Sequence, residues 1–356
     1  MIHIKTLSIA TGTVLASALA LLMYLGSGNL AHFDPALFWY AVVSIISTFA
    51  VGYRFTVWIQ RPASKIYFKR GLQLLFKSRA LSTSTNNIFK KRQIFNPLTL
   101  VLSLKIYLGQ AFILNRSPYR WIMHLCISGG CTLAFAVTFP LVFGWAHFDI
   151  SPLSAEIYIM KFFGVAVDQF SIHSIKAFIT FNLLNIAAII VLIGLIMAAY
   201  RRMTDKGELA TQSFYEDILP LLLIAIVTVT GLALTVSYKF MGGYKHQTMA
   251  VIHMFSVFAL ILYIPFGKLF HMFQRLLHLF VALYKNDGIH SEKATCKCCQ
   301  NSFASLMHVN DLKTILDQLG FNFRFRNSQT EIHYQEICPP CRRKLLVLNQ
   351  GKGLGR

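Results

Sequence analysis

Acidic residues are scarce in this chain, where 14 Asp and Glu stand against 34 Lys and Arg and leave a net charge of +20. The shortage is complete over residues 61–120, which hold twelve basic residues and no carboxylate. Hydrophobic residues make up 55% of the chain, charged residues only 13%, and the mean hydropathy is +0.54. This is the composition of a membrane protein. The basic excess therefore indicates topology, and a nucleic-acid partner is not expected.

Two further absences narrow the class of protein. No small-residue cleavage site follows the apolar stretch 6–26, so we expect that stretch to be a membrane span and not a cleaved signal peptide. No internal repeat is evident, which argues against a solute transporter built from two inverted halves.

Six apolar segments are long enough to cross a bilayer, for which about 20 residues suffice: 6–26, 36–59, 121–144, 174–200, 217–236 and 247–270. Because basic loops stay in the cytoplasm, 61–120 and both termini are predicted to be cytoplasmic and 145–172 to lie outside. The apolar stretch 97–114 is short and flanked by basic residues, so we expect an interfacial helix there. The predicted fold is an all-α polytopic bundle with a small C-terminal domain. Its expected parts are two N-terminal spans (1–60), a basic loop (61–120), a four-helix core (121–280) and a tail (287–356).

The last apolar segment carries a histidine towards each end, His253 and His271. They are 18 residues apart, which is five full turns, so a continuous helix would present both rings on one face, about 27 Å apart. Pro265, between them, is expected to kink the helix locally. Histidines inside a membrane are rare and usually functional. The pair therefore predicts two stacked metal or haem centres, one per leaflet, and the alternative is two interfacial histidines that anchor the helix ends.

Haem b in a helix bundle needs two imidazoles from facing helices at one depth. His124, at the cytoplasmic end of the third span, matches His271 and predicts the inner pair. The outer partner of His253 is either His173, at the start of the fourth span, or His147, beyond the third. His173 is preferred because it can lie on a helix start. A third alternative has no outer haem, and His253 then binds a quinone head group or relays its proton.

The last span, which closes with the motif PFGKLFH, resembles the last membrane helix of the gamma (cytochrome b) subunit of respiratory nitrate reductases. That superfamily includes the membrane cytochromes of heterodisulfide-reductase-like and sulfite-reductase-associated complexes. The resemblance covers about residues 35–280 and implies two b haems that exchange electrons with quinone. It agrees with His124 and His271 as a haem pair. The second histidine of the family motif, ten residues after the first, corresponds here to Ala134, so the outer motif is broken.

The polar tail carries two CxxC pairs, Cys296 with Cys299 and Cys338 with Cys341. Two such pairs around an intervening segment are a specific signature of a tetrathiolate metal site. Disulfides are not expected in a cytoplasmic tail. Structural zinc is favoured, and a rubredoxin-like iron or a cubane iron–sulfur cluster are the alternatives.

Between the two cysteine pairs the pattern predicts a helix over 303–321, capped by Asn310 and stopped by Gly320, and then a short hairpin over 321–337. A metal-binding tail of this size can fold by itself. We expect it to contact another subunit.

Together, the residues and the resemblance predict a membrane cytochrome b subunit of the bacterial cytoplasmic (inner) membrane. It would transfer electrons between the quinone pool and an iron–sulfur or molybdopterin oxidoreductase on the cytoplasmic side, a partner implied by the resemblance alone. No residue set for bond-making catalysis is evident, so the chain is expected to be an electron-transfer subunit and not a complete enzyme. The rival interpretations are a membrane anchor with a zinc-binding docking tail and a solute transporter.

Overall fold

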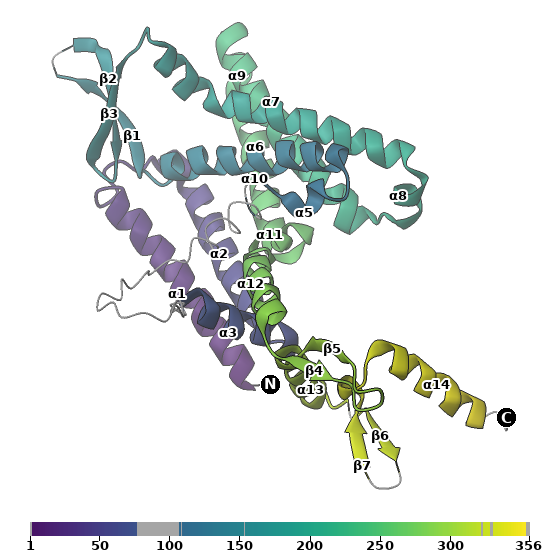
Figure 1. The fold of residues 1–356 in the computed structure, drawn as a ribbon. Helices are drawn as coiled ribbons and strands as arrows, with labels where there is room; N and C mark the ends of the chain where they lie inside the picture. The colour runs from purple at the N-terminus through teal and green to yellow at the C-terminus, as the bar shows by residue number, and fades with distance from the viewer. Residues whose placement is uncertain are drawn as a thin grey trace, which may run out of the picture. The chain divides into compact units, whose positions relative to one another are not determined.

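The fold was analysed in a computed structural model that describes residues 2–76, 107, 109–152, 154–321, 323–327 and 330–353. The chain divides into two compact units. The first unit comprises residues 1–57 and 110–273, and the second comprises 58–109 and 274–356. Helices make up most of both units (Figure 1). Most of the interfacial helix expected over 97–114 lies outside the described residues, which include only its last turn, α5 (Ala111–Leu114).

The prediction of six membrane spans is confirmed, because six helices among the described residues are long and apolar enough to cross a bilayer. They are α1 (Ile2–Gly26), α2 (Phe38–Ile59), α6 (Pro118–Val142), α7 (Ile175–Thr204), α9 (Leu219–Phe240) and α10 (His246–Phe266). Short elements join them: η1 (Pro35–Leu37), α8 (Lys206–Thr211) and the π-helical turn η2 (Phe214–Ile218).

Glycines allow α6 and α7 to pack closely. A Cβ added at Gly130 would lie 2.5 Å from Cγ2 of Val191, and one at Gly194 would lie 2.9 Å from Cβ of Cys126. Both distances are shorter than real contacts allow, so this crossing needs residues without a side chain. Small residues at helix crossings are the usual way in which membrane helices approach one another.

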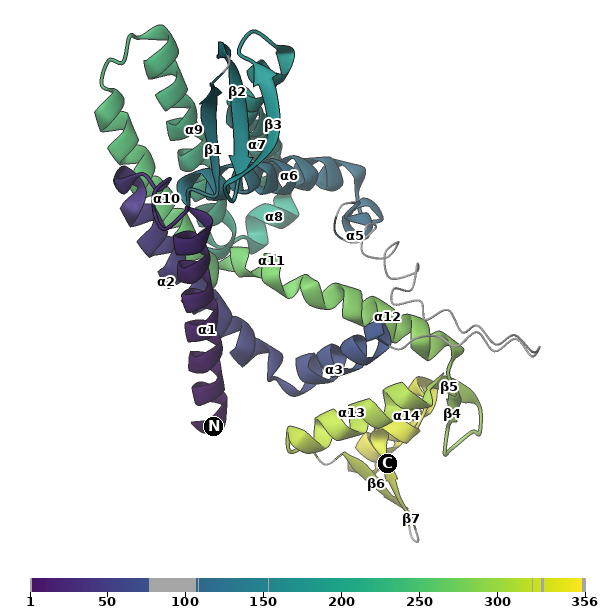
Figure 2. The ribbon, with the colours of Figure 1, turned by 90° about the vertical axis from the view of Figure 1, so that its left-hand side faces the viewer.

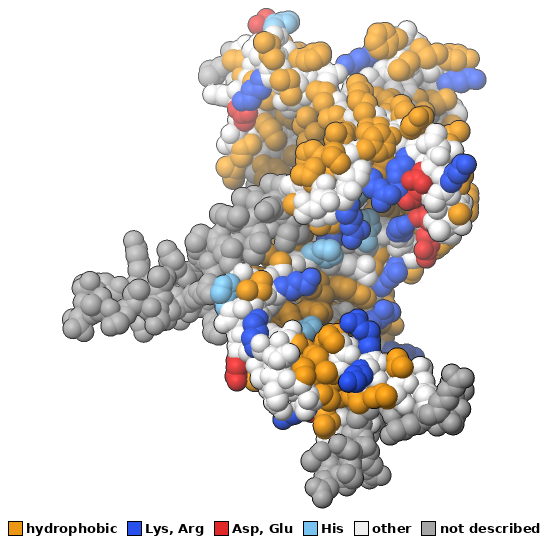
Figure 3. All heavy atoms as spheres, turned by 45° about the vertical axis from the view of Figure 1, so that its right-hand side comes forward, with side chains coloured by type: hydrophobic (Ala, Val, Ile, Leu, Met, Phe, Trp, Pro, Cys, Tyr) orange, Lys and Arg blue, Asp and Glu red, His pale blue; other side chains and the backbone are white. Residues whose placement is uncertain are grey.

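Polar side chains join α7 to α9. Thr235 of α9 donates to Oδ1 of Asn185 at 2.9 Å, and Lys239 donates to Oδ1 of Asn182 at 2.8 Å. A buried amide that bonds a neighbouring helix contributes to packing in a membrane bundle. Charged residues gather instead where α7 ends and α8 begins, and there Arg201 pairs with Glu208 and Arg202 lies 3.7 Å from Asp217. Figure 3 shows this charged group at one end of an otherwise hydrophobic face.

The segment 145–172, treated from sequence as an outer loop, forms a three-stranded antiparallel sheet in the order β1-β2-β3 (Figures 1 and 2). Its strands are β1 (Ala146–Ser151), β2 (Ser154–Phe162) and β3 (Val165–Ser171). Phe163 and Gly164 connect β2 to β3 with positive φ angles of 49° and 77°, the conformation that suits a two-residue hairpin. Phe148 and Phe170 of the sheet contact the Phe181 ring of α7 at 5.2 and 6.2 Å between centroids.

The last membrane helix ends before the end of the predicted span 247–270. The helix α10 stops at Phe266, one residue after Pro265, and is followed by the 3-10 turn η3 (Lys268–Phe270) and by α11 (His271–Gln274). Pro265 has no N–H for the carbonyl of Ile261, and the Ser47 hydroxyl of α2 bonds that carbonyl instead, at 2.9 Å. The Arg54 guanidinium donates to the carbonyl of Pro265 at the helix end.

The residue after this helix end must be glycine. A Cβ on Gly267 would lie 2.0 Å from Cζ of Tyr263, and the backbone of Gly267 is extended (ψ −167°). The expectation that one continuous helix presents His253 and His271 on a single face is therefore wrong. The kink expected at Pro265 is a helix end, because Pro265 removes a helical hydrogen bond and the Tyr263 ring leaves no room for a Cβ at the next step of the chain, Gly267.

In the second unit α3 (Pro62–Phe76) packs on α12 (Leu276–His290). The helices cross at Gly71, where an added Cβ would lie 2.2 Å from Cβ of Phe280. Asp311, which is 8% exposed, accepts hydrogen bonds from Arg70 of α3 at 3.0 Å and from the Tyr284 hydroxyl of α12 at 2.9 Å. The tail is thereby fixed to these two helices.

The tail consists of β4 (Lys293–Thr295), β5 (Ser302–Ser305), α13 (Leu306–Gln318), β6 (Arg324–Asn327), β7 (Thr330–His333), η4 (Tyr334–Glu336) and α14 (Pro339–Gly353). The predicted hairpin is confirmed as β6–β7. The helix is confirmed as well, but its N-cap is Ser305, and Asn310, the expected cap, lies inside the helix. Gly320 follows its end with a φ of +78°, as a terminating glycine does.

Candidate functional site

Four cysteines converge in the tail as their spacing predicted. The Sγ atoms of Cys296, Cys299, Cys338 and Cys341 all lie within 4.8 Å of one another. Those of Cys299 and Cys338 are 3.7 Å apart. A zinc–sulfur bond of about 2.3 Å places the sulfurs of a tetrahedron about 3.8 Å apart. The four thiols are thus arranged to hold one metal ion.

The backbone around Cys296 favours the thiolate form of this residue. Burial alone raises the pKa of the Cys296 thiol, but the N–H groups of Cys338 and Cys298, 3.2 and 3.4 Å from its Sγ, bring that pKa down to about 6. The neighbouring Cys338 thiol raises the pKa of Cys341 to about 12. One thiolate therefore forms readily in this group, whereas a second negative charge close to it is disfavoured. A bound cation would offset the repulsion between neighbouring thiolates.

Two of the four cysteines also belong to the core of the tail. Cys296 and Ile337 are fully buried, Cys338 is 6% exposed, and Phe303, Ile332 and Leu345 pack against them. Cys298, the additional thiol, is exposed and does not belong to the four-sulfur group. A metal ion held by core cysteines would contribute to the folding free energy of the tail.

His124, the predicted inner ligand, lies in the second turn of α6. Its Nδ1 is 2.7 Å from Oε1 of Gln110, whose Nε2 donates to the Ser128 hydroxyl at 2.7 Å. Gln110 is 6% exposed and has a positive φ of 44°, an uncommon conformation for a residue with a side chain. The amide thus holds Nδ1 as the protonated nitrogen, and the lone pair of the ring is on Nε2.

His271 begins α11, and its Nδ1 is 2.7 Å from the carbonyl oxygen of Lys268. A carbonyl only accepts, so Nδ1 carries the hydrogen and the lone pair is again on Nε2. Metal-ligating histidines usually donate the other ring N–H to such an oxygen, which fixes their tautomer and orientation. In both His124 and His271, therefore, Nδ1 faces an oxygen and the lone pair of the ring is on Nε2. Their pairing stays a prediction.

His253 of α10 has the same arrangement within the membrane bundle. Its Nδ1 lies 2.9 Å from Oγ1 of Thr230 on α9. The Thr230 hydroxyl is 2.7 Å from the carbonyl of Ile226, and it can donate its single hydrogen there. It then accepts from Nδ1–H of His253, and the lone pair of this ring also lies on Nε2.

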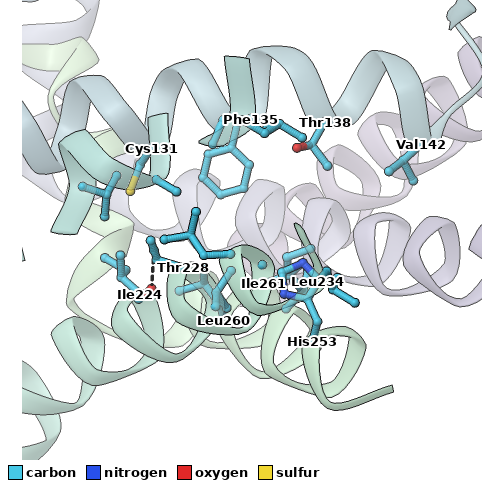
Figure 4. Close-up of a pocket in the computed structure, with 18 of the residues that line it drawn as sticks. Cys131, Phe135, Thr138, Val142, Ile224, Thr228, Leu234, His253, Leu260 and Ile261 are labelled. Carbon is cyan, nitrogen blue, oxygen red and sulfur yellow. Dashed lines mark hydrogen bonds between the residues drawn. The ribbon is translucent and has the colours of Figure 1, made fainter. Parts of the chain in front are cut away.

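His253 lines an apolar cavity of about 380 Å³ among α2, α6, α7, α9 and α10. Figure 4 shows Cys131, Phe135 and Thr138 of α6 on one side of this cavity and Leu260 and His253 of α10 on the other. Polar atoms are few and come from Tyr40, Ser44, Thr138, Asn185, Thr228 and Thr235. A cavity of this size with a few convergent polar groups is typical of a small-molecule site.

The cavity lining bears directly on the outer haem. Ala134, at the position where the family motif has its second histidine, faces the cavity, and neither His173 nor His147 lines it. His173 is exposed in the turn before α7. Among the lining residues, therefore, His253 is the one imidazole, and a second haem ligand is not provided there.

His147 lies in β1, where its ring stacks on that of His32 with centroids 3.7 Å apart and planes 14° from parallel. Both of its ring nitrogens are buried, and neither has a hydrogen-bond partner within the described part of the chain. Burial, followed by the nearby His32, holds the pKa of His147 below its usual value. The neutral form of the ring is therefore favoured.

Sequence reasoning missed the supporting residues Gln110 and Thr230. Neither has a distinctive motif, and both act only through the fold. Comparison with known proteins adds no further constraint, because no family model, curated protein or solved structure matches this chain.

Proposed function

We propose that the chain is a membrane cytochrome b subunit that transfers electrons between quinone and an oxidoreductase on the cytoplasmic side. One observation carries this proposal. The three histidines singled out within or next to the bundle, His124, His253 and His271, each have Nδ1 within 2.7–2.9 Å of an oxygen atom. That arrangement puts the lone pair of each ring on Nε2, the atom that would bind iron or accept from a quinol hydroxyl. The resemblance to the gamma subunits of nitrate reductases supports the same function.

The cavity at His253 is the proposed quinone site. Its apolar walls suit a quinone ring and the start of its isoprenoid tail, and the Thr230 hydroxyl fixes the ring of His253. Nε2 of His253 then accepts the hydrogen bond of a quinol O–H and takes its proton as the quinol is oxidised. Because Ala134 takes the place of a second ligand, we favour this role for His253 over an outer haem with His173 or His147.

His124 and His271 would hold the inner haem b through their Nε2 atoms. The haem supplies a one-electron carrier of tunable potential. The protein groups contribute orientation, since the Gln110 amide and the Lys268 carbonyl keep both rings in the ligating tautomer. A second haem is not required by this arrangement, so the proposal includes one haem, with a second haem at His253 as the alternative.

The tail is proposed to hold one metal ion and to bind the soluble partner. Four sulfurs within 4.8 Å suit a single zinc or iron ion. A cubane cluster places an iron atom behind each thiolate and needs more space between the sulfurs. Two of the four cysteines, Cys296 and Cys338, are also core residues, which favours structural zinc over a redox iron.

The proposed location is the bacterial inner membrane, with both termini in the cytoplasm. The basic segment 61–120 and the basic ends of α7 support this orientation through the positive-inside rule. The soluble partner, an iron–sulfur or molybdopterin oxidoreductase, comes from the resemblance alone.

A reduced-minus-oxidised absorption spectrum of the purified full-length protein tests the function. A b-type haem band is expected, and quinol should reduce it. A protein without haem would instead be a membrane anchor with a metal-binding docking tail, or a transporter. Metal analysis of the same sample distinguishes zinc from iron in the tail.

A further inference from the structure

A basic cavity lies between α3 and α13 in the second unit, and none of its lining residues belongs to the four-cysteine site. Its volume is about 310 Å³. The helix α3 contributes Lys65, Lys69 and Arg70, which are spaced so that successive turns bring them to one face. The helix α13 contributes Asp311, Thr314 and Gln318, again at the spacing of one helical face.

The charges that line this cavity are not balanced. Arg70 is paired with Asp311 at 3.0 Å, and the Tyr284 hydroxyl bonds the other carboxylate oxygen. Lys65 and Lys69 are both exposed and form no ion pair with the described residues. Two ammonium groups therefore point to an anionic ligand, beside a guanidinium that is held in place.

We propose that this cavity binds a phosphoryl group, and specifically the head group of an anionic phospholipid. Lysine ammonium groups are common phosphate ligands, and they contribute point charges to an adaptable site. The Gln318 side chain adds amide donors. The Thr314 hydroxyl already donates to the carbonyl of Asn310 at 3.0 Å, so it contributes to the wall of the cavity and not to anion binding.

The position of Lys65 in the chain favours a lipid over a soluble phosphate. The second span, α2, ends at Ile59, and α3 begins at Pro62. Six residues of chain reach at most about 20 Å, so Lys65 stays near the membrane boundary. Basic residues at such a position attract anionic lipids with about 1 kcal/mol each.

A lipid bound there would contact α3 and α13 together. Because α13 belongs to the metal-binding tail, the head group would hold the tail against the membrane surface. The Arg70–Asp311 ion pair already joins the same two helices, and the lipid would add a second, charge-dependent link.

The test compares phosphatidylglycerol with zwitterionic phosphatidylcholine and soluble glycerol phosphate. Each is titrated into the detergent-purified full-length protein, and bound ligand is counted by native mass spectrometry. The double variant Lys65→Gln/Lys69→Gln is expected to weaken phosphatidylglycerol binding about thirtyfold, the effect of two lysine contacts. Phosphatidylcholine binding should be weak and unchanged. The matched control, Lys285→Gln/Lys344→Gln, removes two lysines of the same unit that do not line the cavity.

Either of two results would overturn the proposal: equal phosphatidylglycerol affinity in the double variant and the native protein, or an equal loss in the control pair. Glycerol phosphate that binds as tightly as phosphatidylglycerol would overturn the lipid as the source of the phosphoryl group. Tail metal content, measured in each variant, checks that the tail is folded. None of these readouts depends on haem, so failure here is separate from failure of the proposed function.

Discussion

The Thr230 hydroxyl lies 2.9 Å from Nδ1 of His253, the one imidazole among the described residues that line the intramembrane cavity. The hydroxyl is held by the helix to which it belongs, through the carbonyl of Ile226. The donor on Nδ1 therefore cannot easily exchange with the acceptor on Nε2. In the proposed quinone site this arrangement keeps Nε2 available as the base.

Thr230→Val tests that relationship, because valine keeps the shape of threonine and removes the hydroxyl. We expect quinol oxidation to fall about tenfold or more, since loss of a supporting hydrogen bond to a functional histidine has effects of 10–100-fold in comparable sites. Haem content should not change. The matched control is Thr228→Val, which lines the same cavity but bonds the carbonyl of Ile224 and not the histidine. Equal losses in the two variants would show that the cavity, and not the contact with His253, is at fault.

Haem content tests the inner ligands directly. His124→Ala and His271→Ala should each abolish the b-type absorption band, because one imidazole cannot replace two. His246→Ala removes an exposed histidine at the start of α10 and should leave the band intact. A protein that keeps full haem content without His124 or without His271 would contradict the ligand assignment.

Gln110→Leu distinguishes orientation from ligation at the same site. The leucine fills the volume but leaves Nδ1 of His124 without its 2.7 Å partner. Haem affinity is expected to fall about 10–100-fold, with the band recovered when excess haem is supplied. A band that haem does not restore would indicate that Gln110→Leu damages the fold of this region.

The spans and the cysteine site follow from sequence because their signals are local. A long apolar run indicates a membrane span without reference to the rest of the chain. Two CxxC pairs likewise identify four candidate ligands, whatever structure the chain forms between them. The helix break after Pro265 was harder to place. Proline indicated a kink, but the end of the helix also depends on Tyr263, whose ring leaves no room for a Cβ on Gly267. That contact exists only in the folded chain.

The sheet β1–β3 and the residues Gln110 and Thr230 were beyond sequence reasoning for a related reason. The Phe148–Phe181 contact, which holds the strands against α7, joins positions distant in sequence. Gln110 is one amide in a poorly patterned segment. Its role depends on a positive φ and on the approach of His124, neither of which sequence reveals.

Adjacent glycines in α6 provide a test of helix packing. Gly130→Ala would place its Cβ 2.5 Å from Cγ2 of Val191 and 3.0 Å from the carbonyl oxygen of Ala187, whereas a Cβ on Gly129 meets nothing within 4 Å. Overpacking of this kind costs about 1–3 kcal/mol. Thermal unfolding of the detergent-purified protein should therefore show a clear loss of stability for Gly130→Ala and little change for Gly129→Ala. The same loss in both variants would mean that helix propensity or the detergent, and not the contact with α7, determines the result.

The tail allows a similar comparison within one motif. Cys296→Ser removes a fully buried ligand, whereas Cys298→Ser changes an exposed thiol two residues away that lies outside the four-sulfur group. We expect the first variant to lose nearly all tail metal and become sensitive to protease in the tail, because Cys296 is both a proposed ligand and a core residue. The second variant should keep one metal ion per chain and native protease resistance. A strong chelator added to the native protein should reproduce the first result. If Cys296→Ser or the chelated protein remained as resistant as the native chain, the metal would not be a folding element of the tail, and the compactness of the tail would come from apolar packing around Ile337 alone.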